Sequence, residues 1–356
     1  MEDPRENKRG NFKHELEDIL FLVISAVVCG LNDWADIEMF GKGQLVWLRK
    51  FFPFKNGIPS HDTLGRVFQR LDTKAFSDCF TQWVSELSEH TKGELIAVDG
   101  KRMCGSFDRS SNKSALHIVS AYATSQKLCL QQVKIEAKSN EITAIPKLLE
   151  MLVLDGCTVS IDAMGCQKDI TQKIVEKKGD YILGLKSNQK ELLEQVKTVF
   201  SVRPSISQHE DHNIDHGRYE LRKCDVITDF TFLDNHKDWS GLQSIVRVQS
   251  KRRNKLTEKY EEQTRYYISS KIADAEVFNK EIRSHWSIEN KLHWMLDVNF
   301  KEDKNRKRKG NSAYNFNMLT KIVLGLLEKE TSKISKSGKR TKAAFDPVFR
   351  EKLLQI

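Results

Sequence analysis

The run Ile96-Ala97-Val98-Asp99-Gly100 is a short apolar stretch that stops at an aspartate, and Val159-Ser160-Ile161-Asp162-Ala163 repeats the pattern further along the chain. A short apolar, β-branched run bounded in this way predicts a buried strand whose last residue emerges at the edge of a sheet. We therefore expect Asp99 and Asp162 each to end a strand.

A third acidic residue, Glu289, lies in a long amphipathic stretch from 283 to 297, which predicts a helix. Two strands and one helix can bring three carboxylates together, as a pair of hard divalent cations requires. Asp99 would then bridge both ions, Asp162 would bind one of them and Glu289 the other. Two Mg²⁺ ions are expected, with Mn²⁺ as the substitute, because both metals suit oxygen ligands.

Taken singly, each of these residues has an ordinary explanation. An aspartate before glycine is often only a turn, and a lone glutamate on a helix is usually solvated. Their order in the chain, strand aspartate, strand aspartate and helix glutamate, is what favours a metal site. In a strongly basic protein, the natural substrate for such a site is a phosphodiester.

Composition limits the class of protein. The chain has 356 residues, 39% of them hydrophobic, and a formal net charge of +9, which fits an anionic polymer as partner. No segment approaches the roughly 18 apolar residues of a membrane span, and residues 19–31 are interpreted as a core helix. Seven cysteines without a CxxC pair indicate reduced thiols in a cytoplasmic protein and argue against a zinc module.

Periodicity divides the chain into five parts. Residues 1–92 are predicted to be helical, with Ser60 capping one helix; a DNA-binding head with a helix-turn-helix element and a structural cap are equally compatible with the pattern. Residues 93–208 alternate strands and helices, which predicts an α/β core with a mixed sheet. The expected strands are 95–99, 116–122, 128–135, 158–162 and 181–185, and the expected helices are 142–152, 168–177 and 189–200.

The remainder holds an insertion and a second helical part. Residues 209–272 are predicted to be a β-rich insertion, with strands at 219–227, 243–249 and 264–269. Residues 273–330 are helical again and complete the core. Residues 331–356 are interpreted as a basic, mobile tail, because 331–342 hold five basic residues and no acidic ones.

Several longer motifs resemble one family, the H-repeat-associated insertion-sequence transposases. The resemblance covers about residues 13 to 328 and the chain looks full length. The motifs that carry it are Gly57-Ile-Pro-Ser-His-Asp-Thr-Leu-Gly-Arg66, Asp99-Gly-Lys-Arg102 followed by Gly105-Ser106, Leu116-His-Ile-Val-Ser-Ala121, Lys138-Ser-Asn-Glu-Ile-Thr-Ala-Ile-Pro146, Ile161-Asp-Ala-Met-Gly-Cys-Gln167, Asp180-Tyr-Ile-Leu183, His216-Gly-Arg-x-Glu-x-Arg222 and the stretch from Arg283 to Val298.

The resemblance implies an α/β fold: a ribonuclease-H-like mixed sheet flanked by helices, with an N-terminal helical domain and a β-rich insertion before the last catalytic helix. It implies that Asp99, Asp162 and Glu289 form the catalytic triad of a DDE enzyme, which cuts DNA at the ends of an insertion sequence and joins them to a target. The implied partner is double-stranded DNA, as terminal inverted repeats and target DNA. Synapsis of two ends suggests a homodimer.

One departure concerns the last helix. Many DDE relatives with a β-rich insertion carry a Tyr, an Arg, the Glu and a Lys there, whereas the matching positions here hold Ile282, His285, Glu289 and Leu296. His285 can still reach a phosphate, but the Tyr and Lys contacts are missing. The sequence therefore leaves open how the cleaved end is held.

Basic residues near these motifs are candidates for DNA contacts. For Lys186, the alternative to a DNA contact is a place in an ordinary surface turn. For Arg218 and Arg222, which have Glu220 between them, the alternative is a ladder of ion pairs on the protein surface. The histidines at 285 and 293 flank Glu289 at helical spacing, and hydrogen bonding within a polar cleft is the alternative to a phosphate contact. The complete set of DNA-binding candidates is Lys101, Arg102, Lys186, Arg218, Arg222, His285, Arg306 and Arg308.

Three further patterns lie on or after the last helix. Core packing is favoured over base stacking for Trp286 and Trp294. A solvated helix end is favoured over a second acidic shell for the acidic residues at 297, 302 and 303. The segment 304–309, with five basic residues in six, is a candidate phosphate track.

Three functions remain compatible with the sequence. The leading one is a transposase that cleaves DNA and transfers strands. The second is a ribonuclease-H-like nuclease that cuts without joining, and the third is a catalytically inactive or domesticated DNA-binding relic. An intact triad argues against the relic, although an inactive copy can keep its acidic residues.

Overall fold

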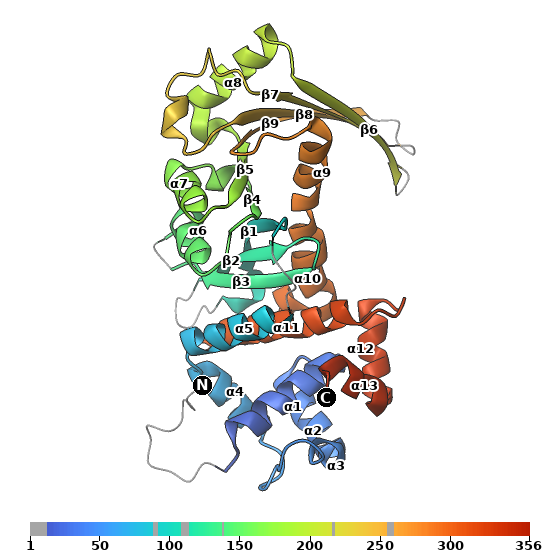
Figure 1. The fold of residues 1–356 in the computed structure, drawn as a ribbon. Helices are drawn as coiled ribbons and strands as arrows, with labels where there is room; N and C mark the ends of the chain where they lie inside the picture. Colours follow the sequence, from blue (N-terminus) through green and yellow to red (C-terminus); the bar gives the residue numbers. More distant parts are fainter. Residues whose placement is uncertain (1–12, 88–91, 108–113, 137–138, 216–217, 255–259) are drawn as a thin grey trace.

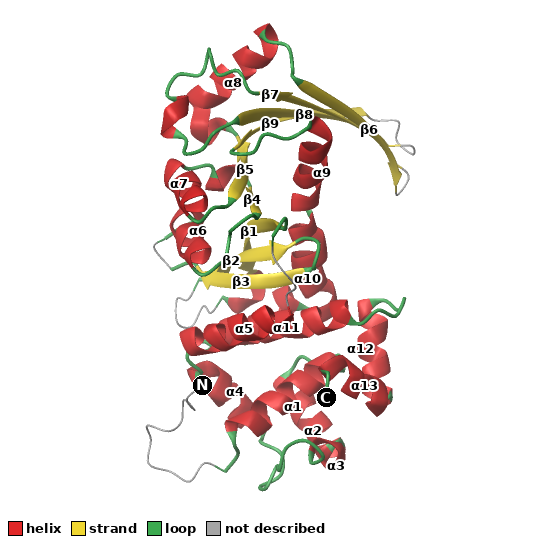
Figure 2. Ribbon diagram, viewed as in Figure 1, coloured by secondary structure: helices red, strands yellow, loops and turns green. Residues whose placement is uncertain are grey.

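A long mixed sheet organises the molecule in the computed structural model, which describes residues 13–87, 92–107, 114–136, 139–215, 218–254 and 260–356 (Figures 1 and 2). The strands of these residues follow the order β3-β2-β1-β4-β5-β9-β8-β7-β6. They are β1 (Leu95–Met103), β2 (Leu116–Ala123), β3 (Leu128–Lys134), β4 (Thr158–Ile161), β5 (Asp180–Leu185), β6 (Ser207–Asp215), β7 (Arg218–Ile227), β8 (Ser244–Asn254) and β9 (Tyr260–Ser269).

The first five strands confirm the expected ribonuclease-H-like sheet. β1, β4 and β5 run parallel, while β2 is antiparallel to both β1 and β3. β4, most of β5 and the first four residues of β1 are buried, as expected for parallel strands covered by helices on both faces. Helices α6 (Glu141–Glu150) and α7 (Lys168–Glu176) lie on one side of these strands in Figure 1, and α9 (Ala275–His285) lies on the other.

The β-rich segment continues the same sheet, because β9 pairs antiparallel with β5. From there β8, β7 and β6 extend it as an antiparallel, curved ribbon (Figure 2). Sequence reasoning missed β6. Its residues Ser-Gln-His-Glu-Asp-His-Asn-Ile-Asp are almost all polar, so they show no alternation of apolar side chains. Helix α8 (Lys190–Val202) links β5 to this ribbon.

Between residues 13 and 87 the structure is helical, as periodicity predicts for residues 1–92, of which 1–12 and 88–91 lie outside the described residues. The Ser60 hydroxyl caps α4 by accepting a hydrogen bond from the Thr63 backbone N–H, at 3.4 Å. Helices α5 and α11 pack against the edge strand β3, so this region shares the hydrophobic core of the sheet. The helices are α1 (Leu16–Val28), α2 (Trp34–Gly43), α3 (Leu45–Leu48), α4 (His61–Arg70), α5 (Thr73–Leu87) and α11 (Ser312–Lys329).

The prediction of a mobile basic tail is wrong. Residues 336–354 form α12 (Lys336–Phe345) and α13 (Pro347–Leu354), which pack against α1. Arg350 is only 1% exposed; its guanidinium donates to the Ala343 carbonyl and lies 4.5 Å from the Trp47 ring centre. Arg340 donates to the Val27 carbonyl. These basic residues therefore join the C-terminal helices to helices near the N-terminus.

Candidate active site

Asp99 lies within β1 rather than at its end, which corrects the sequence prediction. β1 continues to Met103 because β2 pairs with it along its whole length, with Asp99 opposite Ser120. On the other side of β1, the pairing with β4 stops at Val98 opposite Ile161. Asp99 is therefore the first β1 residue without a β4 partner, and its backbone reads as a strand only because of β2.

Asp162 follows β4 directly and begins the next turn. Its carboxylate Oδ1 accepts a hydrogen bond from the Met164 backbone N–H at 3.0 Å, which caps the short 3₁₀ helix Ala163–Gly165. Since Val98 and Ile161 are the last pair between two parallel strands, the two aspartates are the next residues at the same end of the sheet. The sheet thus brings two of the three predicted acids together.

Glu289 lies on a π-helical turn, Ile288–His293, between α9 and α10 (Trp294–Phe300). The predicted continuous helix is thus interrupted. The Trp294 backbone N–H bonds to the carbonyl of Glu289, five residues earlier. A π-helical turn within a helix is rare and is frequently found at functional sites. It changes the phase of the helix at the position where the glutamate faces the sheet.

Two histidines, one at the end of α9 and one at the end of the π-helical turn, contact the two aspartate-bearing strands. His285 Nδ1 lies 3.0 Å from the Ser160 hydroxyl on β4. His293 Nδ1 lies 3.5 Å from Asp99 Oδ2. Burial lowers the pKa of His285 to about 4 and that of His293 to about 3, so both rings are neutral at pH 7. Both histidines therefore contact polar groups of the protein itself, which agrees with the alternative of hydrogen bonding within a polar cleft.

The three predicted acids interact electrostatically. Burial, then the negative charges of Glu289 and Asp162, raise the pKa of Asp99 to about 7. Burial and Asp162 also raise the pKa of Glu289, while the nearby guanidinium of Arg265 opposes that shift. Asp162 and Glu289 line the same cavity, of about 380 Å³, between β4, β5, β9 and α9. Like charges held this close favour a cation.

Glu141 is a fourth carboxylate at this place, and sequence reasoning did not single it out. It is the first residue of α6, and its Oε1 lies 2.9 Å from His117 Nε2 on β2. The carboxylate occupies the space where a Cβ on residue 100 would stand, so Gly100 is required for it to approach β1. Its charge acts on both Asp99 and Asp162. An Asp-Gly pair inside a strand was the available signal.

The donor set suits a hard divalent cation, because it consists of carboxylates and the crowded Asp99 is strained electrostatically without one. Among the described residues, no three His, Cys, Asp or Glu side chains are already arranged tightly enough to hold a metal ion. The backbone therefore brings the carboxylates together, and cation binding would have to draw their side chains closer.

Arg265 is a second residue that sequence reasoning missed. It comes from β9, lines the carboxylate cavity and places its guanidinium 4.8 Å from the centre of the Trp286 ring. Strand β9 is polar at this end, so nothing in its sequence pattern distinguishes Arg265 from the other polar residues as a site residue. The favoured core packing of the tryptophans is wrong: Trp294 is 54% exposed and Trp286 lines the cavity.

The predicted DNA-binding residues fall into two groups. Lys101 and Arg222 lie inside the protein: the Lys101 ammonium lies 2.6 Å from Asp297 and 2.8 Å from Glu302, and Arg222 is 6% exposed and donates to Asn279. Asp297 and Glu302 therefore bind a lysine instead of forming a solvated helix end. Lys186 follows β5, is exposed and lines the carboxylate cavity.

The basic segment 304–309 is divided between surface and interior. Arg306 is exposed, as is Arg102 on β1. The Arg308 guanidinium donates to the Gly105 carbonyl at 3.1 Å. Lys307 is buried, donates to a carbonyl near α2, and has its pKa lowered to about 8 by that burial. A continuous phosphate track along this segment is thus not present. Arg218 begins β7, but its side chain lies outside the described residues.

The strand order defines a class, the proteins built on a ribonuclease-H-like sheet. Comparison with protein families agrees. Residues 90–326 match the model described as "Transposase DDE domain", and residues 1–84 match the one described as "DDE_Tnp_1-associated". The chain belongs to the DDE transposase family.

Two relatives extend over nearly the whole chain. "Putative transposase YncI" of Escherichia coli O157:H7 is 44% identical over 361 residues, which is 99% of this chain and 92% of that protein. "H repeat-associated putative transposase YhhI" of Escherichia coli K12 is 40% identical over 349 residues, covering 94% of this chain and 90% of that protein. These matches place the chain among the H-repeat-associated transposases, as the sequence motifs indicated.

A comparison with solved structures gives a weaker result. A piggyBac transposase in a synaptic complex with hairpin DNA is 14% identical, with a TM-score of 0.47, over 99% of this chain and 76% of that one. A likeness of this size supports no conclusion about fold or partners. Among the helices that the structure describes, none combines the length and apolar character needed to cross a bilayer.

Proposed function

We propose that this protein is an active DDE transposase that cleaves DNA at the ends of an insertion sequence and joins the cut strand to a target. The observation that carries the proposal is the meeting of Asp99, Asp162 and Glu289 at one end of the parallel strands. Burial, followed by the negative charges of Glu289 and Asp162, raises the pKa of Asp99 to about 7, and a carboxylate perturbed in this way supports a functional site.

Two divalent cations at such a site supply a reactive water or 3′-hydroxyl and stabilise the leaving oxygen. The charges of Asp162 and Glu289 both act on Asp99, so Asp99 would help to hold both ions, with Asp162 and Glu289 each holding one. Mg²⁺ is the ion we propose, with Mn²⁺ as its substitute, since the ligands are oxygens. The neutral His293, 3.5 Å from Asp99, would orient that carboxylate.

Basic residues around the carboxylate cavity would position the scissile phosphate. Arg265 lies close enough to Glu289 to oppose the rise in the pKa of that carboxylate, and Lys186 lines the same cavity from the end of β5. Arg265 thus supplies, from β9, a cation that the last helix lacks. His285, which donates to or accepts from Ser160, holds the helix against β4 rather than reaching outward.

The experiment that tests the proposal uses purified protein, Mg²⁺ or Mn²⁺, and labelled duplexes carrying the inverted repeats that flank the gene, with a supercoiled plasmid as target. Joined products support the proposal. Nicks without joined products, even at high target concentration, favour the nuclease. A mobility shift without cleavage favours the DNA-binding relic. Asp162→Asn is the matched inactive control in each arm.

We also propose that two copies act together, because two element ends must be brought to one target. Mass photometry of the protein with and without end DNA tests this, and a monomer in the joining complex contradicts it. The seven cysteines, all of them among the described residues, form no disulfide, which agrees with action on chromosomal DNA in the cytoplasm.

A further inference from the structure

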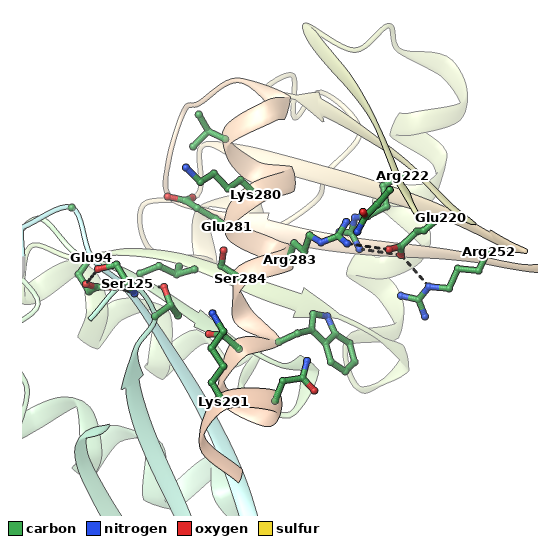
Figure 3. Close-up of a pocket in the computed structure, with 18 residues that line it drawn as sticks. Glu94, Ser125, Glu220, Arg222, Arg252, Lys280, Glu281, Arg283, Ser284 and Lys291 are labelled. Carbon is green, nitrogen blue, oxygen red and sulfur yellow. Dashed lines mark hydrogen bonds and ion pairs between the residues drawn. The ribbon is translucent and has the colours of Figure 1, made fainter. Parts of the chain in front are cut away.

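We propose that a groove on the outer side of α9 binds the phosphate backbone of the DNA strand that enters the active site. This inference rests on the proposed function and adds to it the path of the substrate. The groove has a volume of about 1130 Å³ and runs between the start of β1 and the β6–β8 ribbon (Figure 3). Its charged lining residues are Glu94, Glu220, Arg222, Arg252, Lys280, Glu281, Arg283 and Lys291.

One end of the groove is an arginine cluster built around Glu220. Arg252 stands directly opposite Glu220 on the neighbouring strand, and its Nε lies 3.0 Å from Oε1. Arg283 reaches across from α9, with Nη2 3.4 Å from Oε2 (Figure 3). Arg222, two residues after Glu220 on the same face of β7, lies 4.0 Å from Oε1. One carboxylate therefore orients three guanidinium groups.

Exposure separates the roles inside this cluster. The side chains of Glu220 and Arg222 are only 15% and 8% exposed, whereas those of Arg252 and Arg283 are 43% and 39% exposed. Asp211 also lies 3.6 Å from Arg283, which leaves three arginines against two carboxylates. The buried pair fixes the position, and the two exposed arginines present forked donors, which suit a phosphate.

Two lysines continue the positive charge, Lys280 on α9 and Lys291 on the π-helical turn that follows it. Lys280 and Lys291 are exposed, line the groove and are drawn on it in Figure 3. Eleven positions separate them, about 16 Å of helix at 1.5 Å per residue. That length matches on the order of five phosphates of one strand at 3.4 Å each. A binding site of this length fits a polymer rather than a single small anion.

The acidic residues of the groove are engaged by neighbours. Glu281 pairs with Lys271 at 2.6 Å, and Glu94 accepts a hydrogen bond from the Ser125 backbone N–H at 2.9 Å. They therefore oppose the lysines less than their number indicates. Among the described residues, no ion pair joins Lys280 or Lys291 to a carboxylate, so both charges are available to a ligand.

The groove meets the active site at Trp286. This side chain lines both the groove and the cavity that holds Asp162 and Glu289. Trp286 lies three residues before Glu289, and its ring stacks against the guanidinium of Arg265. A strand bound along α9 would thus reach the carboxylates without a gap.

The test measures DNA affinity rather than cleavage. Arg252→Ala, Lys280→Ala and Lys291→Ala are titrated by fluorescence anisotropy against a labelled inverted-repeat duplex from 50 to 300 mM salt. Each lost phosphate contact lowers the slope of log affinity against log salt by about 1, and the triple variant binds at least tenfold more weakly at the lowest salt. Lys291→Arg keeps the slope, because the charge remains.

Lys197→Ala is the matched control, since it removes the same charge from an exposed position on α8 outside the groove. Thermal unfolding confirms that each variant is folded. Wild-type affinity and slope in the triple variant overturn the groove, even if end DNA is still cleaved and Asp162→Asn abolishes that cleavage. In that case the proposed function stands. Loss of slope in the triple variant with none in Lys197→Ala supports the groove.

Discussion

Asp99 and Asp162 are the first residues beyond the last backbone pair of two adjacent parallel strands, Val98 of β1 with Ile161 of β4. Neighbouring strands lie about 4.8 Å apart, so this register fixes the distance between the backbone positions that carry the two carboxylates. β2 holds Asp99 from the other side and prevents β1 from fraying there. The position of the two acids is therefore a property of the sheet and does not depend on a flexible loop.

Neutral replacement of each acid tests their shared role. Asp99→Asn, Asp162→Asn and Glu289→Gln keep the shape of the side chain and remove its charge. We expect each to lower cleavage of end DNA at least 1000-fold while changing DNA affinity less than threefold, because the carboxylates hold cations and not phosphates. Gel assays and anisotropy on the same preparations check this. Near-normal cleavage by any variant removes that residue from the mechanism.

Asp99→Asn is also expected to stabilise the protein in EDTA. The pKa of Asp99 is raised from 3.8 to about 7, so the folded state holds its proton more tightly than the unfolded chain. For this group, stability is full below about pH 4 and is lost as pH rises through 7. The variant should gain on the order of 2 kcal/mol at pH 8 and little at pH 4.5. Urea unfolding measures both, and an equal gain at the two pH values contradicts the shift.

Gly100→Ala is expected to disturb the fourth carboxylate. A methyl group at this position overlaps the Glu141 carboxylate, and it stands 3.0 Å from His117 Nε2. We expect a loss of about 1–3 kcal/mol of stability from overpacking. Cleavage should fall at least tenfold in Gly100→Ala. It should fall as much in Glu141→Gln, which removes the charge without introducing a steric clash. Glu150→Gln, at the exposed end of the same helix, should cleave normally. Full cleavage by Glu141→Gln excludes a role for Glu141.

Lys101→Met tests whether this lysine serves the fold or the DNA. Its ammonium lies within 2.8 Å of both Asp297 and Glu302, and it also donates to the His293 carbonyl. Removing it leaves a buried carboxylate unpaired, so a loss of about 3 kcal/mol is expected. The salt dependence of DNA binding should stay unchanged. A salt slope reduced by about 1, with normal stability, would instead show a phosphate contact.

Glu330→Gln tests the C-terminal helices. Glu330 lies 3.0 Å from Lys352 and 3.2 Å from Lys339, and together with Ser332 these groups lower its pKa to about 2 despite burial. Its stabilisation is present above about pH 4.5 and is lost as pH falls through 2. The variant should lose about 2 kcal/mol at pH 7 and much less near pH 2.5. A mobile tail would make the substitution neutral at every pH.

Local pattern was sufficient for most elements of the core. The β-branched runs at 95–99 and 158–162 could hardly be anything but buried strands, and Ser60 and Asn140 are ordinary helix caps that accept hydrogen bonds from their own first turns. The longer motifs also gave the family. These features are local in sequence, so a window of ten residues contains the physical information that determines them.

Contacts distant in sequence decided the rest. β6 and the exposed end of β9 are polar and become strands only through pairing, and the basic residues of 331–356 are ordered because α1 and α11 cover them. Glu141, Arg265, Arg252 and Arg283 gain their roles from neighbours far along the chain.

The sequence by itself thus determined which residues are acidic, which segments are apolar, and the family to which the chain belongs. Tertiary structure alone decided that Asp99 lies inside a strand, that Glu289 lies on a π-helical turn, and that Lys101 faces inward. The physical reason is that the register of a sheet and the burial of a charge depend on partners that no local window contains.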